Sequence, residues 1–266
     1  SFIFAHGHGL IEGVPGVAKP LLARLLARWV DAQFSRVQFT PDLMPSDVLG
    51  TNIFNVKTQE FEFHQGPVFS DIVLVDEINR APAKTQAALF EVMEERQVSM
   101  DGATYPMGEL YTILATQNPV EQEGTYRLPE AQLDRFLMKV TMGYPSADDE
   151  LEILKRHEQR TDLIKLSDVN PVLTKEEVLQ LRSYMNDVLV DESLLRYITQ
   201  IVQQTRSSRA VYLGASPRAS VAMLQASKAY ALLQGRDFVT PEAIKAVTPS
   251  ILQHRLVLTA EAEMEG

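Results

Sequence analysis

A glycine-rich segment that ends in a lysine is the part of this chain best suited to hold a phosphate. It lies between a short apolar strand and an apolar helix, and it reads Gly13-Val14-Pro15-Gly16-Val17-Ala18-Lys19-Pro20. Glycines let backbone N–H groups close around phosphate oxygens, and the N-terminus of a helix adds partial positive charge. Lys19 would place a full positive charge on the β- and γ-phosphates of a nucleotide. The alternative is a glycine-containing turn with no ligand.

Two positions of this segment depart from the general phosphate-loop pattern, which has glycine before the lysine and Ser or Thr after it. Ala18 replaces the glycine, which we take as a small change, and Pro20 replaces the hydroxyl residue. That hydroxyl normally binds Mg²⁺, so Pro20 puts Mg²⁺ affinity and turnover in doubt. Proline is tolerated in the first turn of a helix, so we expect the fold to survive.

Two acidic residues end a fully apolar run. The run Ile72-Val73-Leu74-Val75 has the length and composition of a strand buried on both faces of a parallel sheet, and Asp76 and Glu77 follow it. Open α/β sheets bind ligands at the carboxyl ends of their strands. One carboxylate can hold the Mg²⁺ shell and the next can orient or deprotonate a water. A solvated strand end is the alternative.

A third apolar strand is expected over 111–116, and it leads to the amides Gln117 and Asn118. An amide at this strand end can hydrogen-bond the γ-phosphate or the attacking water. A polar turn before Pro119 is the alternative.

Several longer words of the sequence resemble those of the MoxR ATPases, a branch of the AAA+ superfamily. They are GVPGVAK, FTPDLMPSDVLGT, GPVF, VDEINRAPAK, ATQNPVEQEGTY, LPEAQLDRF and YLGASPRAS. The resemblance runs from about Gly9 to the C-terminus. It implies an α/β P-loop NTPase (AAA+) domain, a parallel sheet with helices on both faces, followed by a small all-α lid domain. It also implies an upstream segment that helps hold the adenine, and the chain begins inside or after that segment.

The resemblance assigns roles to individual residues. Gly13, Gly16 and Lys19 belong to the phosphate loop (Walker A), whose whole run from 13 to 20 is expected to bind ATP. Asp76 and Glu77 match the Walker B acids, with Asp76 at the Mg²⁺ shell and Glu77 activating water. Asn118 matches the first sensor and Arg135 matches the arginine finger. Arg218 matches the second sensor, in the lid.

The two arginines have a physical rationale as well. Charge builds on the γ-phosphoryl oxygens during transfer, and a positioned guanidinium is worth about 10³–10⁵ in rate. In AAA+ rings the finger acts on the nucleotide of the neighbouring subunit, so an isolated subunit would be nearly inactive. The alternative for Arg135 and for Arg218 is a surface or salt-bridging arginine. Arg80, which follows the Walker B acids, is a further candidate for facing a neighbour.

Composition limits the classes of protein that fit. The 266 residues are 45% hydrophobic and 23% charged, which is ordinary for a globular chain. The absence of cysteine excludes disulfides, thiol catalysis and thiolate metal sites. No apolar run long enough for a membrane span and no secretory signal are seen, which favours a cytoplasmic protein. The net charge of −10 argues against a dedicated nucleic-acid binder.

Two domains are expected, 1–142 and 143–266. In the first, leucines at helical spacing after the phosphate loop predict a core helix face, 36–40 alternates like a strand, and 84–96 has a helical pattern. In the second, helix-start signals stand at Ser146, Thr174 and Thr240.

Two inserted hairpins are expected within the first domain. They run from 52 to 63, with a break at 57–59, and from 97 to 107, with Asp101-Gly102 as the turn. Aromatic residues of the first hairpin either contact a client or pack as the hairpin core, and packing is favoured. They are Phe54, Phe61, Phe63 and the adjacent His64.

Three functions compete. The resemblance implies an ATP-driven remodelling motor that assembles as a homo-oligomeric ring, most often a hexamer. The motor would have a chaperone-like or metal-insertion role, usually with a partner protein that carries a von Willebrand factor A domain. A nucleotide-binding switch or scaffold with weak hydrolysis is the alternative that Pro20 suggests. A DNA-acting AAA+ motor is the third, and the acidic balance counts against it.

Overall fold

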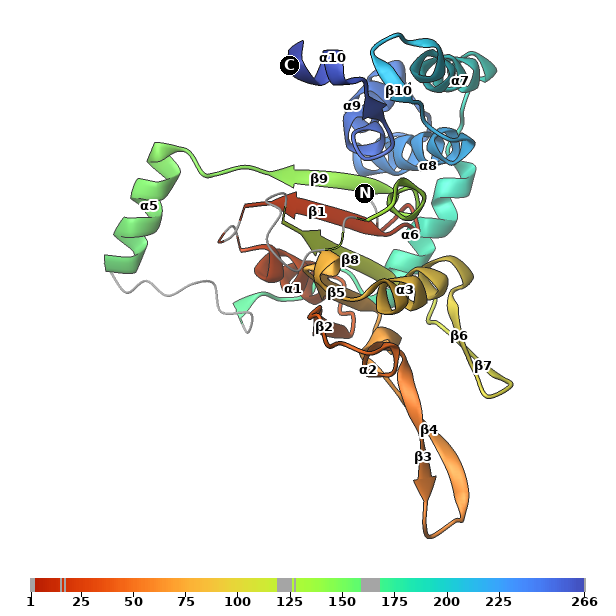
Figure 1. Cartoon of the computed structure of the whole chain (residues 1–266). Coiled ribbons are helices and arrows are strands. Elements are labelled where there is room, and N and C mark those ends of the chain that lie inside the picture. The colour runs from red at the N-terminus through yellow and green to blue at the C-terminus, as the bar shows by residue number, and fades with distance from the viewer. Residues whose placement is uncertain are drawn as a thin grey trace. The chain divides into compact units, whose positions relative to one another are not determined.

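A computed structural model describes residues 3–14, 16, 18–118, 126, 128–158 and 168–265 (Figure 1). By spatial contacts the chain forms two compact units. The phosphate-loop unit comprises 11–126 and 141–178, and the arginine unit comprises 1–10, 127–140 and 179–266. The units are interleaved along the sequence, and the expected boundary after residue 142 stays a prediction. No helix among the described residues is long and apolar enough to cross a membrane.

A five-stranded sheet has the order β2-β5-β8-β1-β9. The strands are β2 (Phe34–Gln38), β5 (Ile72–Asp76), β8 (Thr112–Gln117), β1 (Gly9–Gly13) and β9 (Met138–Met142). β5 runs parallel to both β2 and β8, so the carboxyl ends of these three strands meet at one edge. Every residue of β5 is buried, as the apolar run predicts. The strand expected over 36–40 begins two residues earlier, at Phe34.

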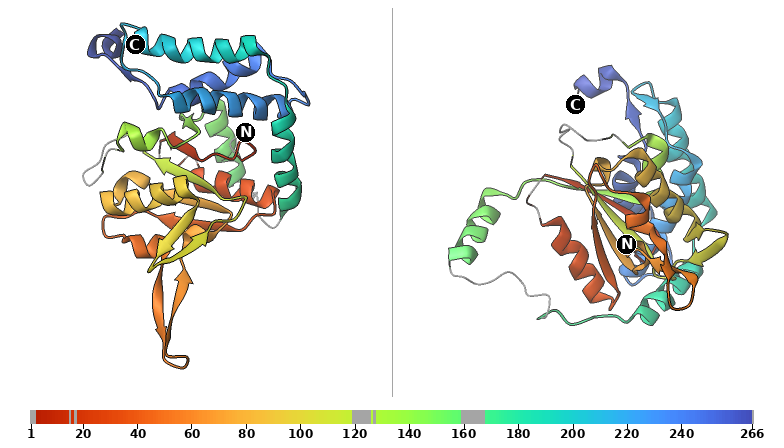
Figure 2. Two further views of the ribbon diagram at one scale, coloured as in Figure 1. Left: turned by 90° about the vertical axis from the view of Figure 1, so that its right-hand side faces the viewer. Right: turned by 60° about the horizontal axis from the view of Figure 1, so that its bottom comes forward.

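The helices α1 (Lys19–Trp29) and α3 (Ala83–Glu95) flank opposite faces of the sheet (Figure 2, right). The predicted leucine face of α1 is only partly confirmed, because Leu21, Leu25 and Leu26 are half-buried. The residues buried within α1 are Ala23 and Ala27, whereas Leu22 and Trp29 are 37% and 48% exposed. Small side chains allow the close approach of α1 to the sheet, so the large side chains lie at the margin. The other helical elements of this unit are α2 (Pro45–Leu49), η1 (Pro67–Phe69), η2 (Ile78–Arg80) and α5 (Ala147–Glu158).

Both predicted hairpins are confirmed. The first, β3 (Gly50–Asn55) with β4 (Glu60–Gln65), extends away from the sheet (Figures 1 and 2), and the second is β6 (Gln97–Met100) with β7 (Ala103–Pro106). The aromatic residues of the first hairpin divide. Phe63 stacks on Tyr105 of the second hairpin with ring centroids 4.2 Å apart, as a packed core requires. Packing is wrong for Phe54 and Phe61, which pair across the strands and are 49% and 71% exposed. His64 is exposed as well.

The predicted helix starts are confirmed by their caps. Ser146 and Asp149 form a reciprocal capping box at α5, and Thr174 and Glu177 form another at α6 (Lys175–Asp187). Thr240 caps α9 (Pro241–Leu252) by accepting a hydrogen bond from the Ala243 backbone N–H.

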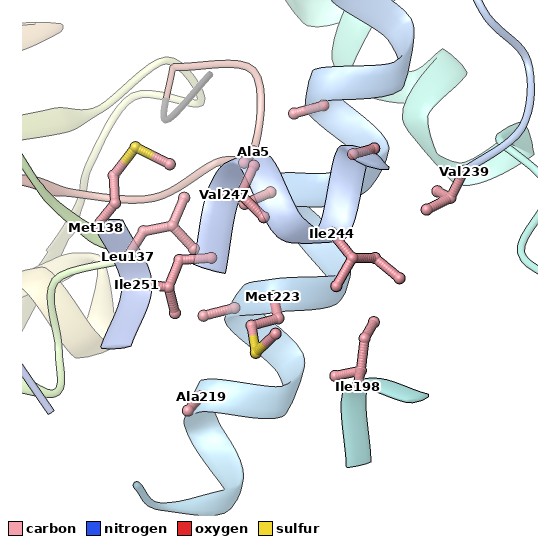
Figure 3. Close-up of a cluster of buried hydrophobic side chains, with 14 of the residues drawn as sticks. Ala5, Leu137, Met138, Ile198, Ala219, Met223, Val239, Ile244, Val247 and Ile251 are labelled. Atoms are coloured by element: carbon pink, nitrogen blue, oxygen red, sulfur yellow. The ribbon is translucent and has the colours of Figure 1, made fainter. Parts of the chain in front are cut away.

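The arginine unit is mainly helical. Its hydrophobic core is built chiefly from α8 and α9, with Met223, Ile244 and Ile251 among the buried side chains (Figure 3). A short antiparallel pair, β10 with β11, interrupts the all-α pattern that the sequence predicts. The elements are α4 (Glu130–Leu133), α7 (Glu192–Ser207), β10 (Val211–Leu213), α8 (Pro217–Leu233), α9 (Pro241–Leu252), β11 (Val257–Leu258) and α10 (Ala260–Glu265).

Candidate active site

The phosphate loop lies between β1 and α1, as the sequence predicts. Gly16 has φ +88°, a conformation that favours glycine. Gly13 is required for another reason, because a Cβ there would lie 2.8 Å from the backbone oxygen of Met142 in β9. Gly13 therefore serves the packing of the sheet. Val14 follows β1, and Pro15 and Val17 lie outside the described residues.

The prediction that alanine in place of glycine at position 18 is a small change is wrong. Ala18 precedes α1 with φ +52° and ψ +31°, the left-handed region. A residue with a Cβ is strained there by about 1–2 kcal/mol. Pro20 lies in the first turn of α1, where it is tolerated but brings no hydroxyl.

Lys19 reaches the carboxyl ends of β1 and β8. Its Nζ donates a hydrogen bond to the backbone oxygen of Gly13 at 2.6 Å and approaches that of Gln117 at 3.5 Å. Partial burial lowers the pKa of Lys19, and the negative charges of Asp76, Glu77 and Glu12 oppose that shift in this order. A further anion, such as a phosphate, would favour the charged ammonium in the same way.

Asp76 is buried at the end of β5, and both of its carboxylate oxygens have partners. Thr116 Oγ1 donates to Oδ1 at 2.5 Å, and Arg36 Nη2 donates to Oδ2 at 2.6 Å. Neither Thr116 nor Arg36 is among the residues that the sequence identifies. The signal in the sequence that could have identified them is their position, because both are polar residues within two positions of the carboxyl ends of the strands that flank β5.

Glu77 is held in a strained backbone conformation beside Asp76. Its φ is +57°, and its N–H donates to Thr116 Oγ1 at 2.9 Å. Glu77 Oε2 accepts from Gln38 Nε2 at 2.8 Å and lies 3.2 Å from Arg80 Nε. Strain of this kind is common at functional sites, where the surrounding contacts maintain it. Arg80, a candidate for facing a neighbouring subunit, pairs with Glu77 of its own chain.

These residues fit a nucleoside triphosphate better than they fit a protein-bound metal. A lysine, a helix N-terminus and two adjacent carboxylates match phosphates and a hydrated cation. Asp76 can contribute one ligand to Mg²⁺, and Pro20 contributes none. Among the described residues, no group of three or more His, Asp or Glu side chains is placed to hold a metal ion. Mg²⁺ here would depend on phosphate oxygens and water for its remaining ligands.

The other predicted site residues are divided between the two units. Asn118 comes directly after β8, at the edge of the sheet that also carries Asp76. Arg135 follows α4 and is half-buried, whereas Arg218 is exposed in the first turn of α8. The structure thus brings Lys19 and the Walker B acids together in the phosphate-loop unit, and both arginines belong to the arginine unit.

Comparisons with known families and proteins agree with this geometry. The sequence model of the ATPase family associated with various cellular activities (AAA) matches residues 8–138. The model of the AAA lid domain matches residues 203–266. Both Walker motifs and Arg135 fall within the first match, and Arg218 falls within the second.

Individual relatives cover nearly the whole chain. The YeaC protein of Bacillus subtilis is 50% identical over 99% of this chain and 82% of its own length. "Chaperone MoxR1" of Mycobacterium tuberculosis is 45% identical over 98% of this chain and 70% of its own length. A crystal structure of a protein from Cytophaga hutchinsonii is 45% identical and superimposes with a TM-score of 0.88, covering 99% of this chain and 82% of that one. The chain therefore belongs to the MoxR family of AAA+ ATPases.

Proposed function

We propose that this chain hydrolyses ATP with Mg²⁺ in a homo-oligomeric ring, most simply a hexamer, and uses the cycle to remodel a partner protein. The observation that carries the proposal is the network around Thr116, which accepts a hydrogen bond from the Glu77 backbone and donates one to Asp76. One hydroxyl thereby fixes both Walker B acids beside Lys19.

Each residue has a role that its position supports. Lys19 balances the charge of the β- and γ-phosphates, and Glu77 polarises the attacking water, with the Asn118 amide orienting it. Mg²⁺ held through Asp76 would neutralise developing phosphate charge. Arg135 of a neighbouring subunit and Arg218 stabilise the charge of the transferred phosphoryl group.

The partner is a protein that this chain contacts through an exposed aromatic surface. The relative "Chaperone MoxR1" supports a chaperone-like role. Metal insertion and a partner with a von Willebrand factor A domain follow from the family resemblance, as does a cytoplasmic location. The exposed Phe54–Phe61 pair of the β3–β4 hairpin offers an aromatic surface for a client.

A nucleotide-dependent switch with slow hydrolysis is the second candidate. Two observations favour it. Pro20 supplies no hydroxyl to Mg²⁺, and the Arg36 guanidinium is bonded to Asp76 Oδ2, one of the oxygens that Mg²⁺ would use.

The steady-state ATPase rate in Mg²⁺, measured against protein concentration, separates the two candidates. Glu77→Gln is the blank, because it keeps the size of the side chain and removes the base. A rate per subunit that rises with concentration and disappears in the blank supports an active ring. ATP binding without turnover above the blank at any concentration contradicts the motor. Pro20→Thr is compared in parallel, and a much faster rate identifies Pro20 as a brake on hydrolysis.

A further inference from the structure

One buried guanidinium supports the segment that carries Arg135. The side chain of Arg255 is 3% exposed, and each of its nitrogen atoms donates a hydrogen bond. Nε bonds the Asp134 carboxylate at 2.7 Å, while Nη1 and Nη2 bond backbone oxygens. The backbone acceptors are Leu137 at 3.1 Å, Ile251 at 2.7 Å, Asp134 at 3.2 Å and Phe136 at 2.6 Å. The chain on both sides of Arg135 is therefore tied to α9 and the residues after it.

The second oxygen of Asp134 is tied to the helix that carries Arg218. Ser216 Oγ donates to Asp134 Oδ2 at 2.7 Å. The same Oγ caps α8 by accepting from the Arg218 backbone N–H at 3.1 Å. One carboxylate thus joins the residue before Arg135 to the helix turn that contains Arg218.

Electrostatics places the Arg218 charge close to this group. Burial is the main factor that lowers the pKa of Arg255, Asp134 opposes that shift, and the positive charge of Arg218 adds to it. Two guanidinium groups within electrostatic range repel each other, and the Asp134 charge between their elements compensates for that repulsion.

The neighbouring His254 adds a further bond to the same segment. Its Nε2 lies 3.0 Å from the backbone oxygen of Phe136, and the side chain is buried. The segment over 134–137 is consequently held from its carbonyl side by two consecutive residues, His254 and Arg255.

We infer that Asp134, Arg255 and Ser216 form a positioning clamp that fixes the backbone of Arg135 relative to the α8 turn that carries Arg218, so that a subunit presents Arg135 to its neighbour's nucleotide in a fixed orientation. A long arginine side chain is useful in catalysis only when its backbone is fixed, because a displacement of about 1 Å can cost on the order of 10²-fold in rate. The inference rests on the proposed function, in which Arg135 acts on the neighbouring subunit.

Mixed rings test the clamp directly. Asp134→Asn keeps the shape of the side chain and removes its charge. We expect turnover to fall about 10–100-fold, with nucleotide affinity unchanged because Lys19 and Asp76 belong to the other unit. Mixing this variant with Glu77→Gln should restore turnover above the sum of the two separate rates. A Glu77→Gln subunit supplies an intact clamp and Arg135, and the Asp134→Asn subunit supplies an intact Glu77.

The control mixture is Arg135→Ala with Glu77→Gln. If this control does not regain turnover, the proposed action of Arg135 on the neighbouring subunit is contradicted, and the clamp is contradicted as well. If the control regains turnover and the Asp134→Asn mixture does not, the proposed function stands and the clamp is overturned. Wild-type turnover of Asp134→Asn alone also overturns the clamp.

A second pair of variants keeps the test decisive if Asp134→Asn folds poorly. Ser216→Ala removes a helix cap together with the bond to Asp134, and Thr240→Ala removes a comparable cap from α9. Both should lose about 1 kcal/mol of stability. Only Ser216→Ala should lower kcat, and it should leave the nucleotide Kd unchanged. Equal kcat values for the two variants would contradict a positioning role.

Discussion

Two arginine–aspartate pairs of opposite character occur in the two units. Arg36 and Asp76, in the phosphate-loop unit, meet through one contact, with side chains 40% and 12% exposed. Arg255 and Asp134, in the arginine unit, are 3% and 17% exposed, and the guanidinium is bonded at all of its nitrogens. The aspartate is mostly buried in both pairs, so they differ in the guanidinium: water or a cation can replace that of Arg36, whereas that of Arg255 is part of the core.

The backbone shows the same contrast. Ala18 and Glu77 of the phosphate-loop unit hold left-handed conformations beside the expected phosphates. Arg218, by comparison, sits on a regular helix with a Ser216 cap. Strained conformations persist only where the surrounding contacts maintain them, whereas a capped helix needs no such support.

The largest expected difference between the two pairs is in stability. Arg255→Met leaves the Asp134 carboxylate without its ion pair, so it should lower the free energy of unfolding by about 3–5 kcal/mol. Arg36→Met should lower it by less than about 1 kcal/mol, because the Arg36 side chain is 40% exposed, so water can replace it, and Asp76 keeps its hydrogen bond from Thr116. Urea unfolding of both variants measures the difference. Similar losses would show that the two pairs do not differ as their burial indicates.

Acid should weaken the arginine unit through His254. Burial and, to a lesser extent, the charge of Arg255 lower the pKa of His254 from 6.5 to about 3. The unfolded chain therefore binds a proton between these pH values and the folded chain does not. The free energy of unfolding should fall by about 2 kcal/mol between pH 7 and pH 5 from this residue alone. His254→Asn keeps an N–H donor and should reduce the pH dependence in the same unfolding experiment; an unchanged slope would contradict the assignment.

Relief of backbone strain should stabilise the phosphate loop. Ala18→Gly removes the Cβ from a left-handed residue, and we expect a gain of about 1 kcal/mol in thermal unfolding experiments. Ala87→Gly, at an exposed position of α3, is the matched control and should lose about 1 kcal/mol. A loss at both positions would mean that Ala18 is not strained.

The smallest expected effect on stability concerns Arg36, and its readout is Mg²⁺. Arg36→Gln frees Asp76 Oδ2, so less Mg²⁺ should be required for half-maximal Mg²⁺-dependent binding of a fluorescent ATP analogue, while stability changes by less than about 1 kcal/mol. Arg196→Gln removes an exposed ion pair with Glu192 and should not alter the Mg²⁺ requirement. A higher Mg²⁺ requirement for Arg36→Gln would show that Arg36 supports the cation site instead of competing for it.

Local features of the sequence were sufficient for most of the elements. The buried run at β5, the turn Asp101-Gly102 and the caps Ser146 and Thr240 all lie where the sequence predicts. These features depend on residues within a few positions of one another, so a linear pattern records them. The sequence motifs around Lys19 and Asp76 were likewise sufficient to identify the family.

Partners that are distant in the sequence were decided only by the tertiary structure. Arg36 and Thr116 each lie 40 residues from Asp76, and Arg255 lies 121 residues from Asp134. Exposure was also decided by the tertiary structure. Phe61 and Phe63 are the same residue type two positions apart on β4, yet only Phe63 stacks on Tyr105, and Phe61 is exposed. Residue types set what each side chain can donate, accept or bury, but strand register and packing choose its partner. Those depend on the whole folded chain, because burial and hydrogen-bond satisfaction are settled together.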